Sequence, residues 1–220
     1  MTKTAIVCGM ISEANIIGHP DNAVVIVAAG NPANLVSDLA DAIKGGCDRV
    51  LSFGTCGALN PNLVAGEIVV GTAAAGPFPI MFDLTWTGRL VAQTRGTRVV
   101  VVKASAAVTT AEQKAALFAE SGADVVDLET CIAARFAYDK CIPFAMLRAV
   151  SDAANQDIPP AALAALNSGG GINVMSVIGS LLGDIRQIPA LARLANSATL
   201  AFNALAAALM DIGVNYGEAP

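Results

Sequence analysis

The stretch that decides the fold runs from Ala123 to Ala154 and reads ADVVDLETCIAARFAYDKCIPFAMLRAVSDAA. It contains two apolar runs, predicted to be buried strands, with a helical pattern of apolar residues between them. The first run ends at Glu129 and the second at Asp152. In open α/β sheets the carboxyl ends of strands face the ligand crevice, so these two carboxylates are candidates for a functional site.

Both acids also have an ordinary structural interpretation. Asp152 would cap the N-terminus of a helix, and Glu129 would lie in a first helical turn, where the helix dipole stabilises negative charge. A carboxylate at the edge of an apolar core must otherwise be solvated, paired or used in chemistry. The local pattern leaves these interpretations open.

The rest of the chain repeats the alternation of strands and helices. Strands are predicted at residues 4–10, 23–29, 49–53, 67–72 and 97–102, and helices from Asn31 to Gly45, from Thr110 to Gly122 and from Pro189 to Met210. Farther along we expect a glycine-rich break at 168–171 and a helix at 173–182. This order predicts an α/β protein, a three-layer α/β/α sandwich. We expect one domain over residues 1–214 and a disordered tail over residues 215–220.

The composition is apolar but contains few aromatic residues. Hydrophobic residues make up 55% of the 220 residues, aromatic residues 5% and charged residues 14%. This predicts a tightly packed interior of small side chains together with a buried subunit interface. The net charge of −5, without any cluster of lysine and arginine, argues against nucleic acid as a partner.

Metal-binding and secretion signals are both missing from the sequence. The five cysteines form no C-x-x-C pair and His19 is the single histidine, so we expect no metal and no other cofactor. An odd number of cysteines without a disulfide framework suits a reducing cytosol, and we expect a cytoplasmic protein. The first residues predict a strand rather than a signal peptide, and no run has the length of a membrane-spanning helix.

A glycine-rich tetrapeptide, Gly54-Thr55-Cys56-Gly57, directly follows the strand predicted at 49–53. Glycines at such a place let the backbone approach a ligand, and Thr55 offers a hydroxyl and an amide together. The tetrapeptide lacks both the G-x-G-x-x-G of dinucleotide sites and the spacing of a P-loop. Its ordinary interpretation is a turn between a strand and a loop.

Three segments, in the same order, resemble one known family. SFGTCGALNPNLVAGEIVV, at residues 52–70, is similar to the glycine signature of the purine nucleoside phosphorylase and methylthioadenosine/adenosylhomocysteine nucleosidase superfamily. Residues 125–154 resemble a second signature of that superfamily, and Met10-x-x-Glu13 resembles its first segment. The resemblance implies the nucleoside phosphorylase/hydrolase fold with a central mixed sheet, and a homodimer.

The C-terminal third narrows the resemblance. The segment from Pro159 onward, rich in alanine and leucine, looks like the tail of the hopanoid-associated branch, the adenosylhopane nucleosidase type. This implies a nucleoside substrate with a lipid 5′ substituent and, with it, transient contact with a membrane surface. The apolar residues Phe78–Phe82 would either form a mouth for that lipid or pack on a partner subunit.

Cleavage of an N-glycosidic bond to a purine needs an acid that protonates the leaving base and a base that holds the attacking water. The resemblance implies that Asp152 is the general acid at purine N7, oriented by Ser151, and that Glu13 activates the water. Glu129 matches the family acid that binds the ribose hydroxyls. Two carboxyl groups on opposite sides of the sugar parallel inverting glycoside hydrolysis.

Further positions match the substrate contacts of the family. They are Asp127 in place of a glutamate, Leu128 in place of a methionine under the sugar, Gly54, Thr55 and Cys56 of the glycine loop, Val108 over the base, and Arg148 near the water or the sugar. After the fifth strand, Ala106 stands in place of an aspartate of the family, which leaves purine selectivity open.

Hydrolysis is favoured over phosphorolysis. Phosphate as the nucleophile needs fixed positive charge, usually arginine, and the position where many family phosphorylases carry it is Ser52 here. The carboxylate of Glu13 would repel phosphate and activate water, although Arg148 leaves phosphorolysis open. The alternatives are a phosphate-dependent purine nucleoside phosphorylase, a methylthioadenosine/adenosylhomocysteine nucleosidase, and a relative that binds nucleosides without catalysis.

Overall fold

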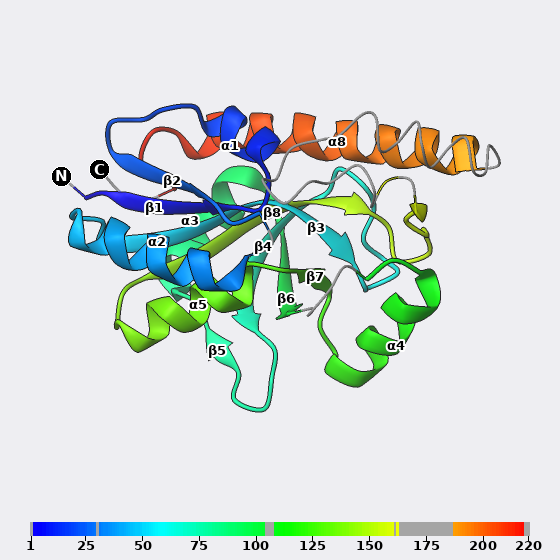
Figure 1. Ribbon diagram of the computed structural model, residues 1–220, viewed down its shortest axis with the longest axis horizontal. Helices are drawn as coiled ribbons and strands as arrows, with labels where there is room; N and C mark the ends of the chain where they lie inside the picture. The colour runs from blue at the N-terminus through cyan, green and yellow to red at the C-terminus, as the bar shows by residue number, and fades with distance from the viewer. Residues whose placement is uncertain (1, 30, 104–107, 161, 163–186, 218–220) are drawn as a thin grey trace.

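Eight strands within the described residues form one central sheet in the computed structural model (Figure 1). The structure describes residues 2–29, 31–103, 108–160, 162 and 187–217. The strands are β1 (Thr4–Cys8), β2 (Ala23–Val27), β3 (Arg49–Ala58), β4 (Ile68–Ala74), β5 (Ile80–Met81), β6 (Thr97–Lys103), β7 (Val125–Asp127) and β8 (Phe144–Asp152).

The sheet is mixed and curls back on itself. β1 pairs in parallel with β2 on one side and with β3 on the other, and β3 pairs in parallel with β8. β8 then pairs antiparallel with β4, β4 pairs in parallel with β6, and β6 with β7. β7 returns antiparallel to the end of β3, so that five strands close a ring. The central mixed sheet that the sequence predicts is confirmed.

β3 is longer than the sequence pattern predicts. The expected strand ends at Phe53, whereas β3 continues through Gly54–Gly57 to Ala58. The continuation is paired with β8 as far as Gly57 and with β7 at Gly57 and Ala58. Tertiary pairing therefore extends a strand that glycine by itself would weaken. The interpretation of Gly54–Gly57 as a turn is wrong, because this segment is part of the sheet.

Helices cover both faces of the sheet and confirm the three-layer sandwich (Figure 1). Those on one face are α1 (Ile11–Ile17), α3 (Leu84–Thr94) and α8 (Ile188–Ile212); those on the other are α2 (Pro32–Lys44) and α5 (Thr130–Asp139). α4 (Ala111–Ser121) lies at one end of the sheet. Two apolar clusters follow this division, one around Leu35 and Met146 and the other around Phe53 and Trp86.

Capping residues begin the helices as the sequence predicts. The side chain of Asn31 accepts a hydrogen bond from the N–H of Asn34 at 3.2 Å at the start of α2. Thr110 and Gln113 form the predicted capping box of α4. The sequence analysis misses α1, α3 and β5. β5 has two residues and α1 has seven, and α1 begins at an N-cap methionine that offers no hydrogen bond from its side chain.

The end of the described chain packs against α3. The indole Nε1 of Trp86 donates to the carbonyl oxygen of Tyr216 at 2.7 Å, and both residues are buried. Tyr216, which was expected to belong to a disordered tail, therefore packs on Trp86, and the tail itself stays a prediction. The predicted break at 168–171 and helix at 173–182 lie outside the described residues. Within the residues that the structure describes, no helix has the length and hydropathy needed to span a bilayer.

Candidate active site

The carboxyl ends of β1, β3 and β8 meet, and the acids predicted from the sequence lie there. β1 leads through Gly9 into α1, which carries Glu13 in its first turn. β8 ends in Asp152, and Glu129 follows β7 as the N-cap of α5. All are buried, with exposed fractions of 1% for Glu13, 5% for Asp152 and 6% for Glu129. Buried carboxylates require partners, and each has its own set.

Four hydrogen bonds hold the carboxylate of Glu13. Its Oε2 accepts from the backbone N–H of Gly9 at 2.8 Å and of Met10 at 3.1 Å. Its Oε1 accepts from the N–H and the hydroxyl of Thr55, at 2.7 and 2.8 Å. These donors replace the water that a buried charge loses. They also join the start of α1 to β3, so Glu13 has a structural function in addition to any chemical one.

Arg148 is the buried cation of the site. Its Nη1 donates to the carbonyl oxygen of Thr55 at 2.7 Å, and its Nη2 donates to Ser52 Oγ at 2.8 Å. Its Nε forms an ion pair with Oδ2 of Asp127 at 2.8 Å. Burial alone would lower the pKa of Arg148, but the negative charges of Asp127 and Glu129 raise it, so the guanidinium is charged.

Asp127 connects this cation to α5. Its Oδ1 accepts from the backbone N–H groups of Glu129 at 3.2 Å and Thr130 at 2.8 Å, and its Oδ2 accepts from the hydroxyl of Thr130. These bonds satisfy N–H groups that the first turn of a helix leaves open. Asp127 therefore fixes the backbone beside Glu129, and its expected contact with the substrate stays a prediction.

Glu129 has fewer partners than the other acids. Its Oε2 lies 3.6 Å from Nη2 of Arg148 and also faces the backbone of Gly9, where an added Cβ would lie 3.1 Å away. Burial raises the pKa of Glu129 to about 7, against the opposing effect of the Arg148 charge, and the nearby charges of Asp127 and Glu13 add to the rise. A carboxyl group that titrates near neutral pH can both accept and donate hydrogen bonds there.

Asp152 forms an ion pair that the sequence analysis did not predict. Its Oδ2 lies 2.5 Å from Nζ of Lys114, whose side chain is fully buried. Its Oδ1 lies 2.7 Å from Oγ of Ser151. The register between β3 and β8 shifts at this point, since Cys56 pairs with Val150 and Gly57 pairs with Asp152. This bulge leaves Ser151 unpaired between them, and bulges of this kind redirect side chains beside functional sites.

Glu13 and Asp152 contact the same strand, three residues apart. A Cβ added to Gly54 would lie 2.5 Å from the carboxyl group of Glu13, and one added to Gly57 would lie 3.1 Å from Oδ2 of Asp152. Both acids therefore contact the end of β3, and the expectation that they flank one sugar stays a prediction.

Of the remaining residues predicted for the site, two are half-buried and one points its side chain into the core. Leu128 and Val108 are half-buried, and Val108 packs against the small cluster of Leu59, Ala123 and Val126. The side chain of Cys56 points into the core, where its Sγ donates to the carbonyl oxygen of Ala149 at 3.8 Å. Burial raises the pKa of this thiol, so Cys56 offers only its backbone to a ligand. Ala106 lies outside the described residues.

Sequence reasoning missed Lys114 and Thr130. Lys114 shares a face of α4 with Leu117 and Phe118, three and four residues later, which pack on an apolar cluster. A lysine on the apolar face of a predicted helix was therefore the sequence feature that could have indicated a buried cation. Thr130 Oγ1 lies 2.7 Å from Ser52 Oγ and 3.1 Å from Nε of Arg148. No comparable pattern marks Thr130, because its partners come from distant strands.

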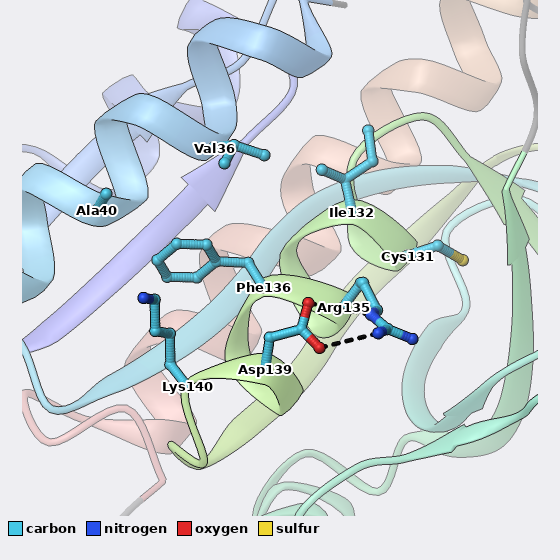
Figure 2. A pocket seen from close by; sticks show the side chains of 8 residues that line it. All are labelled: Val36, Ala40, Cys131, Ile132, Arg135, Phe136, Asp139 and Lys140. Carbon is cyan, nitrogen blue, oxygen red and sulfur yellow. Dashed lines mark hydrogen bonds and ion pairs between the residues drawn. The ribbon is translucent and has the colours of Figure 1, made fainter.

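A hollow of about 690 Å³ opens elsewhere, between α2 and α5 (Figure 2). Val36 of α2 and Phe136 of α5 line its apolar part, and Arg135 pairs with Asp139 at 3.0 Å on its rim. Glu13, Glu129 and Asp152 do not line it. This hollow is therefore separate from the candidate active site.

The apolar segment Phe78–Phe82 lies far from the acids of its own chain. The ring of Phe82 packs on that of Phe144, with centroids 4.7 Å apart. Phe144 begins β8 and Asp152 ends it, so roughly 26 Å of strand lie between them. The side chains of Phe78 and Met81 are exposed, and both a mouth for a lipid and packing on a partner subunit stay predictions.

The structure also bears on metals and phosphate. Among the described residues, no group of three or more histidine, cysteine or acidic side chains is arranged to hold a metal ion. The two buried cations of the site, Arg148 and Lys114, are both engaged by oxygen atoms of the protein.

Comparison with known proteins gave a family and a set of similar folds. A sequence family described as the phosphorylase superfamily matches residues 8–168. Comparison with curated proteins found no match. Among solved structures, the 5′-methylthioadenosine/S-adenosylhomocysteine nucleosidase of Neisseria meningitidis, in complex with methylthio-immucillin-A, is 16% identical with a TM-score of 0.67, covering 94% of this chain and 97% of that one.

Two further structures have the same fold. The futalosine hydrolase of Helicobacter pylori strain 26695 is 17% identical with a TM-score of 0.66, covering 94% of this chain and 97% of that one. The nucleosidase of S. pneumoniae with the transition-state inhibitor MT-ImmA is 15% identical with a TM-score of 0.64, covering 96% and 100%. At these identities the likeness concerns the fold.

Proposed function

The chain belongs to the phosphorylase superfamily, and from this premise we propose that it is a nucleosidase that hydrolyses the N-glycosidic bond of an adenosyl nucleoside and releases adenine. The observation that carries the proposal is the pair of buried acids on one strand end, with Glu13 against Gly54 and Asp152 against Gly57. A protein that only binds nucleosides has no need of two buried carboxylates so placed. The similar structures named as nucleosidases and a futalosine hydrolase support the same reaction class.

The function proposed for each acid follows from the groups that it contacts. Asp152, held by Ser151, donates a proton to N7 of the leaving base, which neutralises the base as the bond from N9 to C1′ breaks. Glu13 accepts a proton from the water that attacks C1′. Glu129, whose pKa is raised to about 7, binds the ribose hydroxyls. Leu128, Val108, Gly54, Thr55 and the backbone of Cys56 enclose the substrate.

Hydrolysis is proposed over phosphorolysis on electrostatic grounds. A phosphate nucleophile needs a cation with N–H groups directed at its oxygens. Arg148 instead bonds to Ser52 and Thr55 of β3 and to Asp127 of β7, and so joins these strands beside the acids. Phosphate near Glu13 would also meet a buried negative charge. Arg148 lies 3.6 Å from Glu129, the acid proposed for the ribose, so its expected place near the water or the sugar stays a prediction.

For the 5′ substituent we propose a lipid, as in adenosylhopane. The support is the resemblance of the C-terminal third to the hopanoid-associated branch. The apolar segment around Phe78 and Met81 lies far from the acids of its own chain, so we also propose that it contacts a second copy of the chain. A homodimer and transient contact with a membrane surface remain part of the proposal, and the mass in solution from light scattering tests the dimer.

The test is product analysis by mass spectrometry. The protein is incubated with adenosylhopane, methylthioadenosine and inosine, each with and without phosphate. From the two adenosyl substrates we expect free adenine and a free sugar in phosphate-free buffer, with no acceleration by phosphate; any base released from inosine is hypoxanthine. Release that depends on phosphate, with a sugar 1-phosphate as product, would establish the phosphorylase alternative. Binding of a nucleoside without release of its base would establish the non-catalytic alternative.

A further inference from the structure

Lys114 is a buried charge that the proposed mechanism does not use. Its side chain is fully buried on α4, and its Nζ donates to Oδ2 of Asp152 at 2.5 Å, to the carbonyl oxygen of Ala153 at 2.8 Å and to that of Gln156 at 2.9 Å. An ammonium group has three N–H donors and no acceptor. Three acceptors therefore use all of them, and the arrangement requires the charged form of the lysine.

α4 is fixed against the segment after β8 by other bonds as well. The backbone N–H of Ala111 donates to Oδ1 of Asp157 at 2.7 Å, and that of Ile158 donates to the carbonyl oxygen of Thr109, also at 2.7 Å. Lys114 thus projects from a helix whose N-terminal end is bonded to the segment that follows Asp152. A long side chain that is immobilised in this way can position its partner accurately.

The two oxygens of Asp152 consequently have different hydrogen-bond partners. Oδ2 accepts from the Lys114 ammonium, and because an ammonium group cannot accept a hydrogen bond, Oδ2 is not the oxygen that carries a proton. Oδ1 faces the hydroxyl of Ser151 at 2.7 Å, and this hydroxyl lies 3.2 Å from the carbonyl oxygen of Cys56. A hydroxyl has one hydrogen but can also accept. When Oδ1 carries a proton, it donates to Ser151 Oγ, and Ser151 donates to Cys56.

We infer that Lys114 is a positioning residue of the acid centre: by holding Oδ2 as an acceptor, it confines the transferable proton of Asp152 to Oδ1, beside Ser151. This inference rests on the proposed function. Asp152, the carboxylate partner of Lys114 in the resting chain, first takes up a proton from solvent at Oδ1; in the step, the bond from Oδ1 to hydrogen breaks and a bond from N7 to that hydrogen forms. The electron pair of the bond from C1′ to N9 moves into the base, and Asp152 becomes a carboxylate. The Lys114 charge stabilises that carboxylate as it forms.

The test compares Lys114→Met, Lys114→Arg and the wild type in steady-state adenine release. Methionine is close in length to lysine but has no charge and no donor. We expect kcat to fall about 100-fold in Lys114→Met, a typical contribution of general acid catalysis, with KM within about 3-fold of wild type. Lys114→Arg keeps the donor and the charge, and we expect its kcat to be at least about tenfold higher than that of Lys114→Met.

A second measurement separates positioning from a structural function. Ser151→Ala is made in the wild type and in Lys114→Met. Because Lys114→Met frees Oδ2 to carry the proton, we expect the serine substitution to lower kcat about tenfold in the wild type and less than about 3-fold in the lysine variant. A structural lysine predicts the same factor in both. If Lys114→Met does not fold, Lys114→Leu, which also lacks charge and donor, replaces it in the same comparison, with the same expectation.

Each outcome decides between the two proposals. If the wild type releases no base from any nucleoside tested, the proposed function is wrong and the inference about Lys114 is wrong with it. If the wild type is active and Lys114→Met matches its kcat, only the inference is overturned. The inference is overturned as well if kcat and KM both change in Lys114→Met and Lys114→Arg does not recover them. It is also overturned if Ser151→Ala lowers kcat by the same factor in the wild type and in Lys114→Met.

Discussion

Glu13 and Glu129 both contact the backbone of Gly9, although they come from opposite halves of the chain. The N–H of Gly9 donates to Oε2 of Glu13 at 2.8 Å, and a Cβ at residue 9 would lie 3.1 Å from Oε2 of Glu129. Four donors stabilise the charge of Glu13, whereas Glu129 has Arg148 at 3.6 Å. Burial, together with the negative charges of Asp127 and Glu13, explains why the pKa of Glu129 is raised to about 7.

The titration of Glu129 predicts a pH-dependent stability. Its pKa is about 7 in the folded chain and 4.5 as the reference value, so folding favours the protonated form. The stabilisation is fully present below pH 4.5 and is lost as the pH rises through 7. Relative to Glu129→Gln, which does not titrate, the wild type should lose up to about 3 kcal/mol of unfolding free energy across this window.

Urea denaturation from pH 4 to pH 8 measures this difference. The same variant serves as the control for substrate binding, because an ionised Glu129 accepts from the ribose hydroxyls. We expect KM of the wild type to rise as the pH falls below 7 and KM of Glu129→Gln to vary little. Parallel stability curves for the two proteins would show that Glu129 does not titrate near neutral pH.

Alanine at Gly54 and at Gly9 should have different consequences. At Gly54 an added Cβ meets the Glu13 carboxyl group at 2.5 Å, and the φ of +151° is one that alanine rarely adopts. At Gly9 the nearest atoms, those of the Glu129 carboxyl group, lie at 3.1–3.2 Å and need to move only slightly. We expect Gly54→Ala to abolish adenine release and to lower the melting temperature. Gly9→Ala should chiefly raise KM, and equal effects of the two on kcat would contradict this.

The Lys114–Asp152 ion pair predicts a rescue of stability. Asp152→Asn leaves a buried ammonium without its negative partner, which costs about 3–5 kcal/mol. In the double variant Lys114→Met/Asp152→Asn neither charge remains, and we expect most of that loss to be recovered. Chemical denaturation of the four proteins in the cycle measures the coupling. Adenine release should stay absent in both variants that lack Asp152, which separates its catalytic function from its contribution to stability.

Substitutions of Thr55 and of Glu13 test the proposed function of Glu13 as the base that activates water. The Thr55 hydroxyl takes one of the four acceptor positions of Glu13, and it can rotate away to admit water. Thr55→Val removes this donor with little change of shape, so we expect kcat at or above that of the wild type and a loss of about 1 kcal/mol in stability. Glu13→Gln should abolish release, because a neutral amide does not accept the proton of water. Measurement of adenine release at saturating substrate checks both, and substantial activity in Glu13→Gln would exclude Glu13 as the base.

The sequence by itself determined the α/β class, most strands, and the ends of α2 and α4, because these depend on local periodicity and capping. It also singled out Glu13, Glu129 and Asp152, through motifs that stay recognisable in order along the chain. In the structure all three are buried. Their functions remain predictions.

Tertiary structure decided what surrounds those acids. Pairing with β8 and β7 made Gly54–Gly57 a strand rather than a turn, since hydrogen bonds from distant segments offset the weak strand preference of glycine. Lys114 and Thr130 joined the site because folding brought α4 and α5 to strand ends far away in sequence. The charge partners of a buried acid are set by such long-range contacts, and no local pattern records them.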